Sequence, residues 1–329
     1  MTKDRILITG PNGFIGRATT AALLECGFSV NLAVRETGHL PWSADNDKLK
    51  ITVIGDLAAE DFASRLDPAF ANVRAIVHLA GLAHIATTDR ATADSLFFRA
   101  NVASTKNLAD MALRHDVPLF IHLSSLAAIT PNTSTDIIND STAVPPSTGY
   151  GRSKLAAETE VQKLANAGIF AISLRPPLVT GAGARGNWAA LQKLARTGLP
   201  LPFGSLQSKR SFVSIETLTE AIVALCGKTP DHALSGNYCL ADLETLSVAD
   251  VVTALREGMA MPPRLLRCPT SLFSIIGAMT GRQRQLAGLI GPLEVNSTRF
   301  HATFGFRPTL PLVEAIRRSG AAFVRQAGT

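Results

Sequence analysis

The chain has 329 residues, 46% of them hydrophobic and 18% charged, so it can bury a large core and is neither disordered nor fibrous. Its formal net charge of +6 favours an anionic small-molecule partner. The basic residues are scattered and form no stripe with interleaved aromatic residues, so we expect no nucleic-acid partner.

The four cysteines stand far apart, and the seven histidines are not grouped at metal-ligand spacing. We therefore expect free thiols, no metal site and a reducing, cytoplasmic environment. No signal-peptide pattern precedes the first apolar run. The most apolar late stretch, Ser271 to Met279, is far shorter than the ~20 residues of a transmembrane helix. We expect a core helix there, with contact to a membrane surface as the alternative.

Short β-branched runs alternate with helical segments along the first half of the chain, which predicts an α/β fold with a doubly wound parallel sheet of the Rossmann type. These runs are Ile6–Thr9, Val30–Val34, Ile51–Ile54, Ala75–Leu79, Leu119–Leu123 and Phe170–Leu174. Apolar residues at helical spacing predict a helix that begins after the first run and ends at Gly27, and a second helix after Asn101.

Proline and glycine become frequent after Arg175, which predicts long loops that carry substrate-specific structure. Two later runs, Phe212–Ile215 and Gly236–Leu240, predict that the chain returns to the sheet. We therefore expect a dinucleotide-binding domain over 1–175 and about 208–245, and a substrate domain over 176–207 and 246–329.

A glycine-rich segment lies between the first predicted strand and the first predicted helix. Glycines let the backbone turn sharply and approach a pyrophosphate, which the helix N-terminus then stabilises. An ordinary turn is the alternative, but the position at the first strand–helix junction favours a dinucleotide site. The predicted cofactor residues here are Gly10, Asn12, Gly13, Phe14, Ile15 and Gly16.

The end of the second strand bears on the choice of cofactor. An NAD site usually has an acidic residue there, but this chain has Val34 followed by Arg35. A guanidinium can pair with the 2′-phosphate of NADP, so the sequence favours NADP over NAD, unless Arg35 is only a solvated cation. After the third strand, Asp56 and Leu57 are placed to contact the adenine, although Asp56 could equally cap a helix.

Tyr150 and Lys154 are separated by four residues in a predicted helix, so their side chains share one face. The ammonium is expected to lower the pKa of the phenol from ~10 toward neutrality. Such a phenol can exchange a proton with a substrate hydroxyl while a nicotinamide exchanges a hydride. A hydroxyl at the end of the fifth strand would complete the set, and we favour Ser125 over Ser124, with helix capping as the alternative.

These motifs together resemble the extended short-chain dehydrogenase/reductase family, and in particular its nucleotide-sugar epimerase and 4-ketoreductase branch. The resemblance covers nearly the whole chain and is strongest before about Phe212. It implies that Ser125, Tyr150 and Lys154 are catalytic and that Tyr150 and Lys154 also contact the cofactor. The motifs that carry it are the glycine loop, His78-Leu79-Ala80-Gly81, Asn101-Val102, Ser124-Ser125, Tyr150/Lys154 and Arg175-Pro176-Pro177.

The same resemblance implies roles for residues around and beyond these motifs. Leu79, Ala80, Gly81 and Pro177 are expected to contact the cofactor, and Ser125, Asn187, Phe203 and Arg210 to contact a UDP-sugar. Arg210 suits the diphosphate because a guanidinium fork matches phosphate oxygens. The chain departs from the family over Leu126–Pro131, a segment that commonly has an aromatic Tyr-Gly ending, and at Ala83-His84, where a lysine is common.

The absence of an acid at Leu126-Ala127 disfavours a 4,6-dehydratase. Epimerisation and ketone reduction need the same Ser, Tyr and Lys, and the NADP interpretation of Arg35 favours a 4-ketoreductase, similar to UDP-N-acetylquinovosamine-type enzymes of bacterial surface-polysaccharide synthesis. A 4-epimerase with retained NAD is the first alternative, and a non-catalytic nucleotide-binding protein is the second. The resemblance also implies a homodimer through helices near Asn101–Leu113 and Tyr150–Leu164.

Overall fold

The computed structural model describes residues 4–38, 41–42, 46–83, 85, 87, 89–269, 273, 288 and 290–327. The stretch from Ser271 to Met279, which the sequence predicts to be a core helix, lies outside the described residues except for Phe273, and so does His84. Among the described residues, none of the helices is both long and apolar enough to cross a bilayer.

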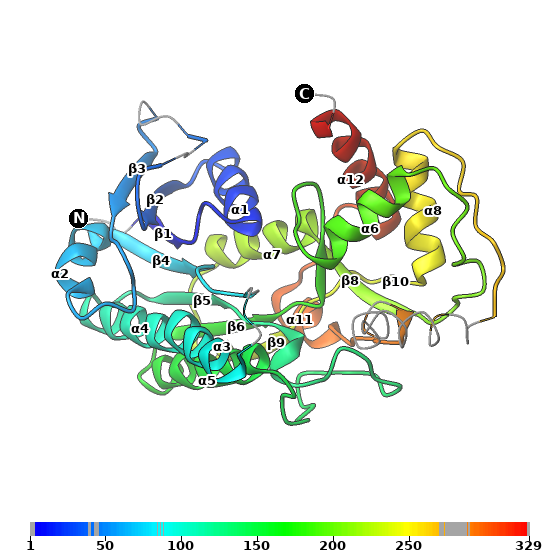
Figure 1. Cartoon of the computed structure of the whole chain (residues 1–329). Coiled ribbons are helices and arrows are strands. Elements are labelled where there is room, and N and C mark those ends of the chain that lie inside the picture. The colour runs from blue at the N-terminus through cyan, green and yellow to red at the C-terminus, as the bar shows by residue number, and fades with distance from the viewer. Residues whose placement is uncertain are drawn as a thin grey trace.

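The larger part of the molecule is built on a seven-stranded sheet with the order β3-β2-β1-β4-β5-β6-β9, in which neighbouring strands are parallel (Figure 1). This confirms the predicted Rossmann architecture. The strands are β1 (Arg5–Thr9), β2 (Ser29–Val34), β3 (Leu49–Val53), β4 (Val73–His78), β5 (Leu119–Leu123), β6 (Phe170–Arg175) and β9 (Gly236–Cys239).

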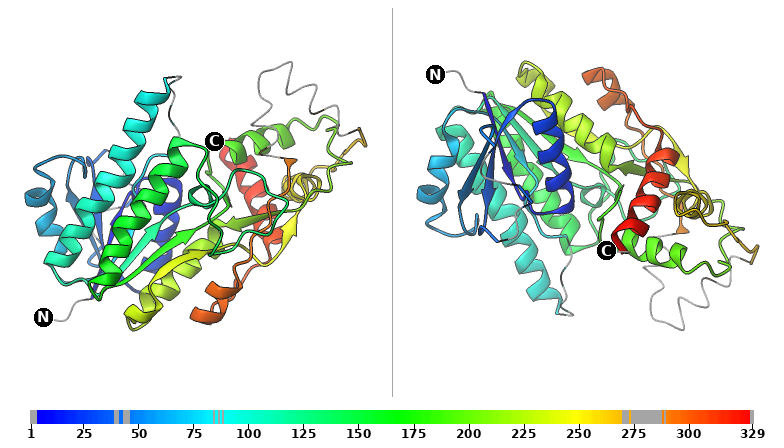
Figure 2. Two further views of the ribbon diagram at one scale, coloured as in Figure 1. Left: turned by 90° about the horizontal axis from the view of Figure 1, so that it is seen from below. Right: turned by 90° about the horizontal axis from the view of Figure 1, so that it is seen from above.

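Helices cover both faces of this sheet (Figure 2). α1 (Phe14–Glu25), α7 (Ile215–Gly227) and α11 (Thr298–Phe304) pack with one face, and α2 (Phe62–Leu66), α4 (Ser104–Arg114) and α5 (Gly149–Asn166) pack with the other. As predicted, α1 stops just before Gly27, whose φ of +86° lies in the left-handed region that favours glycine.

The helix that precedes β5 is interrupted in a way that its sequence does not reveal. α3 (Arg90–Phe97) passes into a π-helical segment, Phe98–Ala103, before α4 begins. This wider turn contains Asn101, whose side chain is buried. Apolar side chains on the outer surface of this layer include Leu113 and Leu155, which are exposed. The predicted homodimer through α4 and α5 stays a prediction.

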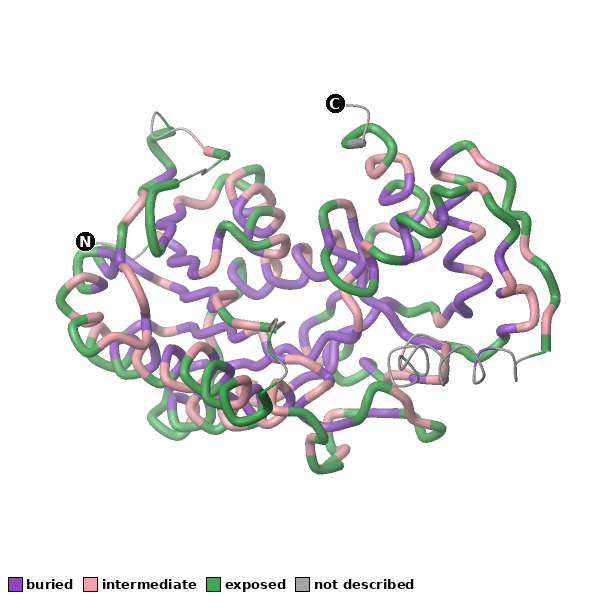
Figure 3. The backbone as a smooth tube through the Cα atoms, viewed as in Figure 1, coloured by how far each residue is buried: buried purple, intermediate pink, exposed green. Residues whose placement is uncertain are grey.

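A second, smaller core lies beyond the carboxyl ends of the main strands. Its three-stranded sheet has the order β10-β8-β7, so β8 does not rejoin the main sheet as expected, whereas β9 does. The burial pattern in Figure 3 follows the two sheets and the inward faces of the helices. The elements of this part are β7 (Leu178–Thr180), β8 (Arg210–Ser214), β10 (Thr245–Leu246), α6 (Asn187–Arg196), α8 (Val248–Gly258) and α12 (Leu312–Ala327).

Candidate active site

A cavity of about 880 Å³ lies between the two parts of the molecule, at the carboxyl edge of the main sheet. In parallel sheets of this order, ligands bind where the strand order reverses, which here is between β1 and β4. Among the predicted site residues, those that line the cavity are Gly10, Gly13, Phe14, Ile15, Gly16, Leu79, Gly81, Ser125, Tyr150, Lys154, Pro177, Asn187 and Arg210.

The glycine loop forms the cavity wall at the start of α1. Gly10 has a φ of +70°, and a Cβ there would lie 2.7 Å from the backbone nitrogen of Ala80, so a side chain would separate the loop from the end of β4. A Cβ on Gly16 would clash with the carbonyl oxygen of Gly10. The first turn of α1 contains no acidic residue. The glycine cradle and this helix N-terminus together fit a dinucleotide pyrophosphate.

We expect Gly16→Ala to lower the free energy of unfolding by about 1–3 kcal/mol, because the new methyl group would displace the Gly10 carbonyl. Gly227→Ala is the matched control, since a Cβ there lies 4.0 Å from its nearest neighbour. Urea unfolding of both variants measures the difference. Equal stability of the two variants would contradict the tight approach of Gly16 to the loop.

Arg35, Asp56 and Leu57 lie outside the cavity lining: Arg35 directly follows β2, and Asp56 and Leu57 come shortly after β3. Arg35 is exposed. Asp56 accepts hydrogen bonds from the Ala58 backbone, at 3.0 Å, and from Arg99, at 2.8 Å. The bond from Ala58 and the charges of Arg99 and Arg35 keep the pKa of the Asp56 carboxyl below its usual value. Asp56 therefore caps a turn, not a helix, and its charge is balanced by nearby arginines.

Tyr150 and Lys154 lie on one face of α5, and both line the cavity. The ring of Tyr150 lies 5.8 Å from that of Phe97, a cavity residue that the sequence analysis did not single out. Burial raises the pKa of Tyr150, and a hydrogen bond with Ser125 opposes this rise. The expected lowering by Lys154 is wrong for this structure, because desolvation of the phenol dominates.

The ammonium of Lys154 is buried, and its Nζ donates a hydrogen bond to the Leu123 carbonyl at 2.8 Å. Burial lowers the pKa of Lys154 to about 8, and the charge of Glu158 opposes this shift. Asn101 closes this side of the site: its amide exchanges hydrogen bonds with the Leu82 backbone and donates to Ser153 at 2.9 Å. A Cβ on Gly81 would lie 2.9 Å from Asn101 Oδ1 and 3.3 Å from Lys154 Nζ, so this position favours glycine.

The two serines that follow β5 have different environments. Ser124 is buried and its hydroxyl donates to Glu158 at 2.5 Å. Ser125 lines the cavity, and its hydroxyl opposes the rise in the pKa of Tyr150. Its Oγ also accepts a hydrogen bond from the Ala127 nitrogen at 3.2 Å, so Ser125 caps the short helix Leu126–Ala128 as well. The geometry therefore favours Ser125 as the hydroxyl that contacts substrate.

The far end of the cavity contains a buried guanidinium. Arg210 is 7% exposed and donates hydrogen bonds to the backbone carbonyls of Gly291 and Asn132. Its burial lowers its pKa to about 10, and among the described residues no carboxylate pairs with it. An anionic ligand group would compensate this charge. Asn187, the first residue of α6, lines the same wall.

Three further predicted contacts, besides Arg35, Asp56 and Leu57, are not brought to the cavity. Asn12 is exposed on the outside of the glycine loop, and Ala80 lies behind it, where its backbone nitrogen donates to Thr9. Phe203 is buried in the smaller core, and its ring stacks on that of Phe273 at 5.9 Å. Its predicted contact with a nucleotide base would require a rearrangement of this packing.

Residues 6–237 match the model of the NAD dependent epimerase/dehydratase family. The chain belongs to this family. Among curated proteins it is similar to a UDP-glucose 4-epimerase of Vibrio cholerae, with 31% identity over 97% of this chain and 95% of the relative. It is also similar to a ceramide reductase of Caulobacter vibrioides, with 28% identity over 83% of this chain and 76% of that protein.

Solved structures show the same fold. The structure of Thermus thermophilus UDP-glucose 4-epimerase in complex with NAD aligns with a TM-score of 0.73 at 20% identity, covering 97% of this chain and 99% of that one. The family membership confirms the resemblance and the expectation of an NAD-dependent enzyme, whereas a preference for NADP stays a prediction.

Proposed function

We propose that this protein reduces the C4 ketone of a UDP-hexose with NADPH. The observation that carries the proposal is the convergence of Ser125, Tyr150 and Lys154 on one wall of a cavity that also contains the glycine loop and the buried cation Arg210. The glycine loop and α1 would bind the dinucleotide, and Arg210 would pair with the diphosphate of the sugar nucleotide.

The cofactor, when bound, supplies a hydride to C4. Tyr150 donates its proton to the carbonyl oxygen, so that the ketone becomes a secondary alcohol. The Ser125 hydroxyl orients that oxygen, and the Lys154 ammonium, which lies on the same helix face as Tyr150, stabilises the phenolate that remains. Burial of Tyr150 keeps the phenol protonated before the reaction, as a proton donor requires.

Epimerisation at C4 is the second candidate, because the Vibrio cholerae relative is named a UDP-glucose 4-epimerase and matches 97% of this chain. Product analysis by NMR distinguishes the two. UDP-glucose, UDP-GlcNAc and a UDP-4-keto-6-deoxy sugar are each incubated with NAD⁺, NADH or NADPH, because an epimerase must first oxidise C4 and a reductase needs a reduced cofactor. Consumption of NADPH with the keto sugar supports the reductase, whereas interconversion of UDP-glucose and UDP-galactose without net NADPH consumption supports the epimerase. Unchanged substrates under every condition would support a non-catalytic nucleotide-binding protein.

We expect Arg35→Ser to raise the Kd for NADPH about tenfold or more and to leave the Kd for NADH nearly unchanged. The lost contact is a charge-assisted hydrogen bond to the 2′-phosphate, which contributes about 1.5–3 kcal/mol. Arg325→Ser, in the last turn of α12, is the matched control. Fluorescence titration with both cofactors measures the effect, and equal weakening of NADPH and NADH binding would argue against recognition of the phosphate.

A further inference from the structure

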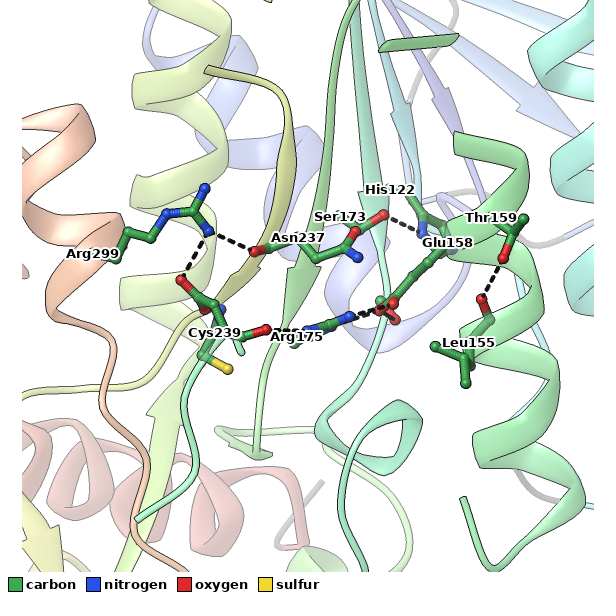
Figure 4. Close-up of polar contacts among 11 residues, drawn as sticks. His122, Leu155, Glu158, Thr159, Ser173, Arg175, Asn237, Cys239 and Arg299 are labelled. Atoms are coloured by element: carbon green, nitrogen blue, oxygen red, sulfur yellow. Dashed lines mark hydrogen bonds and ion pairs between the residues drawn. The ribbon is translucent and has the colours of Figure 1, made fainter. Parts of the chain in front are cut away.

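A buried ion pair joins Glu158 on α5 to Arg175 at the end of β6 (Figure 4). Glu158 and Arg175 have side chains that are only 2% and 5% exposed. Arg175 donates from Nε to Glu158 Oε1 at 2.9 Å and from Nη2 to Oε2 at 2.6 Å, so the contact is bidentate. Ser124 donates to the same Oε1 at 2.5 Å. The carboxylate therefore accepts three hydrogen bonds in a site without solvent.

The three partners come from three different segments, and each is close in sequence to a predicted site residue. Ser124 precedes Ser125 at the end of β5. Glu158 lies one helical turn beyond Lys154 on α5, and Arg175, the last residue of β6, precedes the proline pair that contains Pro177. The carboxylate of Glu158 thus joins the ends of two strands to the helix that carries the phenol.

Backbone hydrogen bonds hold both ends of the Ser124–Ser125 segment, and Ser125 also caps the short helix Leu126–Ala128: its Oγ accepts a hydrogen bond from the Ala127 nitrogen at 3.2 Å and its carbonyl oxygen accepts one from the Ala128 nitrogen at 3.1 Å. The Ser124 nitrogen donates to Leu174 at 2.7 Å, and the Leu126 nitrogen donates to Pro176 at 3.1 Å. These bonds set the distance between the two strand ends. The side-chain bond from Ser124 to Glu158 adds a connection from this segment to α5, at the residue directly before Ser125.

A buried ion pair is weak evidence for stability by itself, because desolvation offsets much of the attraction. The additional Ser124 hydroxyl is what distinguishes this pair. A network that satisfies all its members can select one conformation of the segments that it joins.

We propose that Glu158 is a positioning residue, whose carboxylate, through Ser124, fixes the peptide that presents the Ser125 hydroxyl to Tyr150. The proposal rests on the proposed roles of Ser125 and Tyr150 in catalysis. Arg175 keeps the Glu158 carboxylate in place, so its role is indirect as well. Ser124, Glu158 and Arg175 do not contact substrate in this proposal.

Ser124→Ala tests the proposal and leaves the ion pair intact. We expect kcat to fall at least tenfold, while KM for the sugar nucleotide and Kd for the cofactor change less than twofold. Ser173→Ala is the matched control. This change also removes one buried serine hydroxyl. The Ser173 Oγ, on β6, lies 3.1 Å from His122 Nδ1, and in the described part of the chain it has no hydrogen bond with the Ser124–Ser125 segment. Wild-type kcat in Ser124→Ala, or an equal loss in both variants, would overturn the proposal.

A second measurement needs no substrate, so it stays informative if the proposed function is wrong. The chain has two tyrosines, and NMR of protein labelled at the tyrosine ring carbons, assigned with Tyr238→Phe, reports on the surroundings of the Tyr150 hydroxyl. We expect the Tyr150 resonance of Ser124→Ala to move toward that of Ser125→Ala, and that of Ser173→Ala to coincide with wild type. A Tyr150 resonance unchanged in Ser124→Ala would overturn the positioning role, whereas lack of turnover by the wild-type enzyme would overturn only the proposed function.

Discussion

Tyr150→Phe should lower kcat for reduction of the 4-keto sugar by a factor of about 10² to 10⁴, which is the range expected for loss of a positioned proton donor. The phenol is half-buried near Phe97, and it lines the cavity together with Ser125, whose hydroxyl opposes the rise in the pKa of Tyr150. Without it the oxygen at C4 would carry negative charge beside a buried ammonium and a neutral hydroxyl. Hydride transfer would then form an alkoxide with no proton donor, so kcat should fall more than KM rises.

Tyr238→Phe provides the matched control for this change. Tyr238 is buried in β9, its hydroxyl donates to the Leu234 carbonyl at 2.8 Å, and neither residue lines the cavity. Its loss should cost about 1 kcal/mol of stability and leave turnover intact. Cofactor titrations should give the same Kd for wild type and Tyr150→Phe. Wild-type turnover by Tyr150→Phe would exclude this phenol as the proton donor.

The parts of the site that the sequence reveals are those set by local spacing. The glycine loop lies at a strand–helix junction that short-range periodicity identifies, and the interval of four residues places Tyr150 and Lys154 on one helix face. The electrostatics of the phenol do not follow from spacing. They depend on burial of the phenol, whose ring lies close to that of Phe97, and on the neighbouring Ser125 hydroxyl.

Long-range contacts account for most of what the sequence leaves undetermined. The choice between Ser124 and Ser125 depends on Glu158, which is 34 residues away. β8 joins the smaller sheet because it pairs with β7 and β10, and Arg210 binds carbonyls of Asn132 and Gly291, 78 and 81 residues distant. Hydrophobic patterns identify such segments as strands or loops but do not specify which segment is the partner.

The second large expected effect comes from a row of buried polar side chains across the main sheet. Thr9, His78, His122 and Ser173 are register partners on β1, β4, β5 and β6. His78 hydrogen bonds to Thr9 at 2.7 Å and to Thr105 at 3.0 Å. His122 Nδ1 bonds to Ser173, and among the described residues its Nε2 has no partner. Both rings are 1% exposed and lie 5.8 Å apart.

Protonation of either imidazole would place a charge in this interior. Burial lowers the pKa of His78 from 6.5 to about 3, and the charge of Lys154 acts in the same direction. Burial also lowers the pKa of His122 well below 6.5, with Lys154 and His78 as smaller causes. Because both pKa values are depressed in the folded state, the unfolded chain binds more protons once the pH falls below about 6.5. The contribution of the two neutral histidines to the free energy of unfolding is therefore complete above about pH 6.5 and is lost as the pH falls.

We therefore expect the free energy of unfolding to decrease by about 1.4 kcal/mol per pH unit for each of the two histidines below about pH 6.5, or by about 3 kcal/mol between about pH 8 and about pH 5.5. Urea unfolding across this range measures the slope. His122→Gln should remove about half of the slope, because its amide carries no ionisable proton. His232→Gln, at an exposed position on the short helix His232–Leu234, should retain the wild-type slope. If the unfolding free energy of the wild-type protein stayed constant from about pH 8 to about pH 5.5, both rings would have to accept protons in the folded state, and the buried row could not be a neutral one.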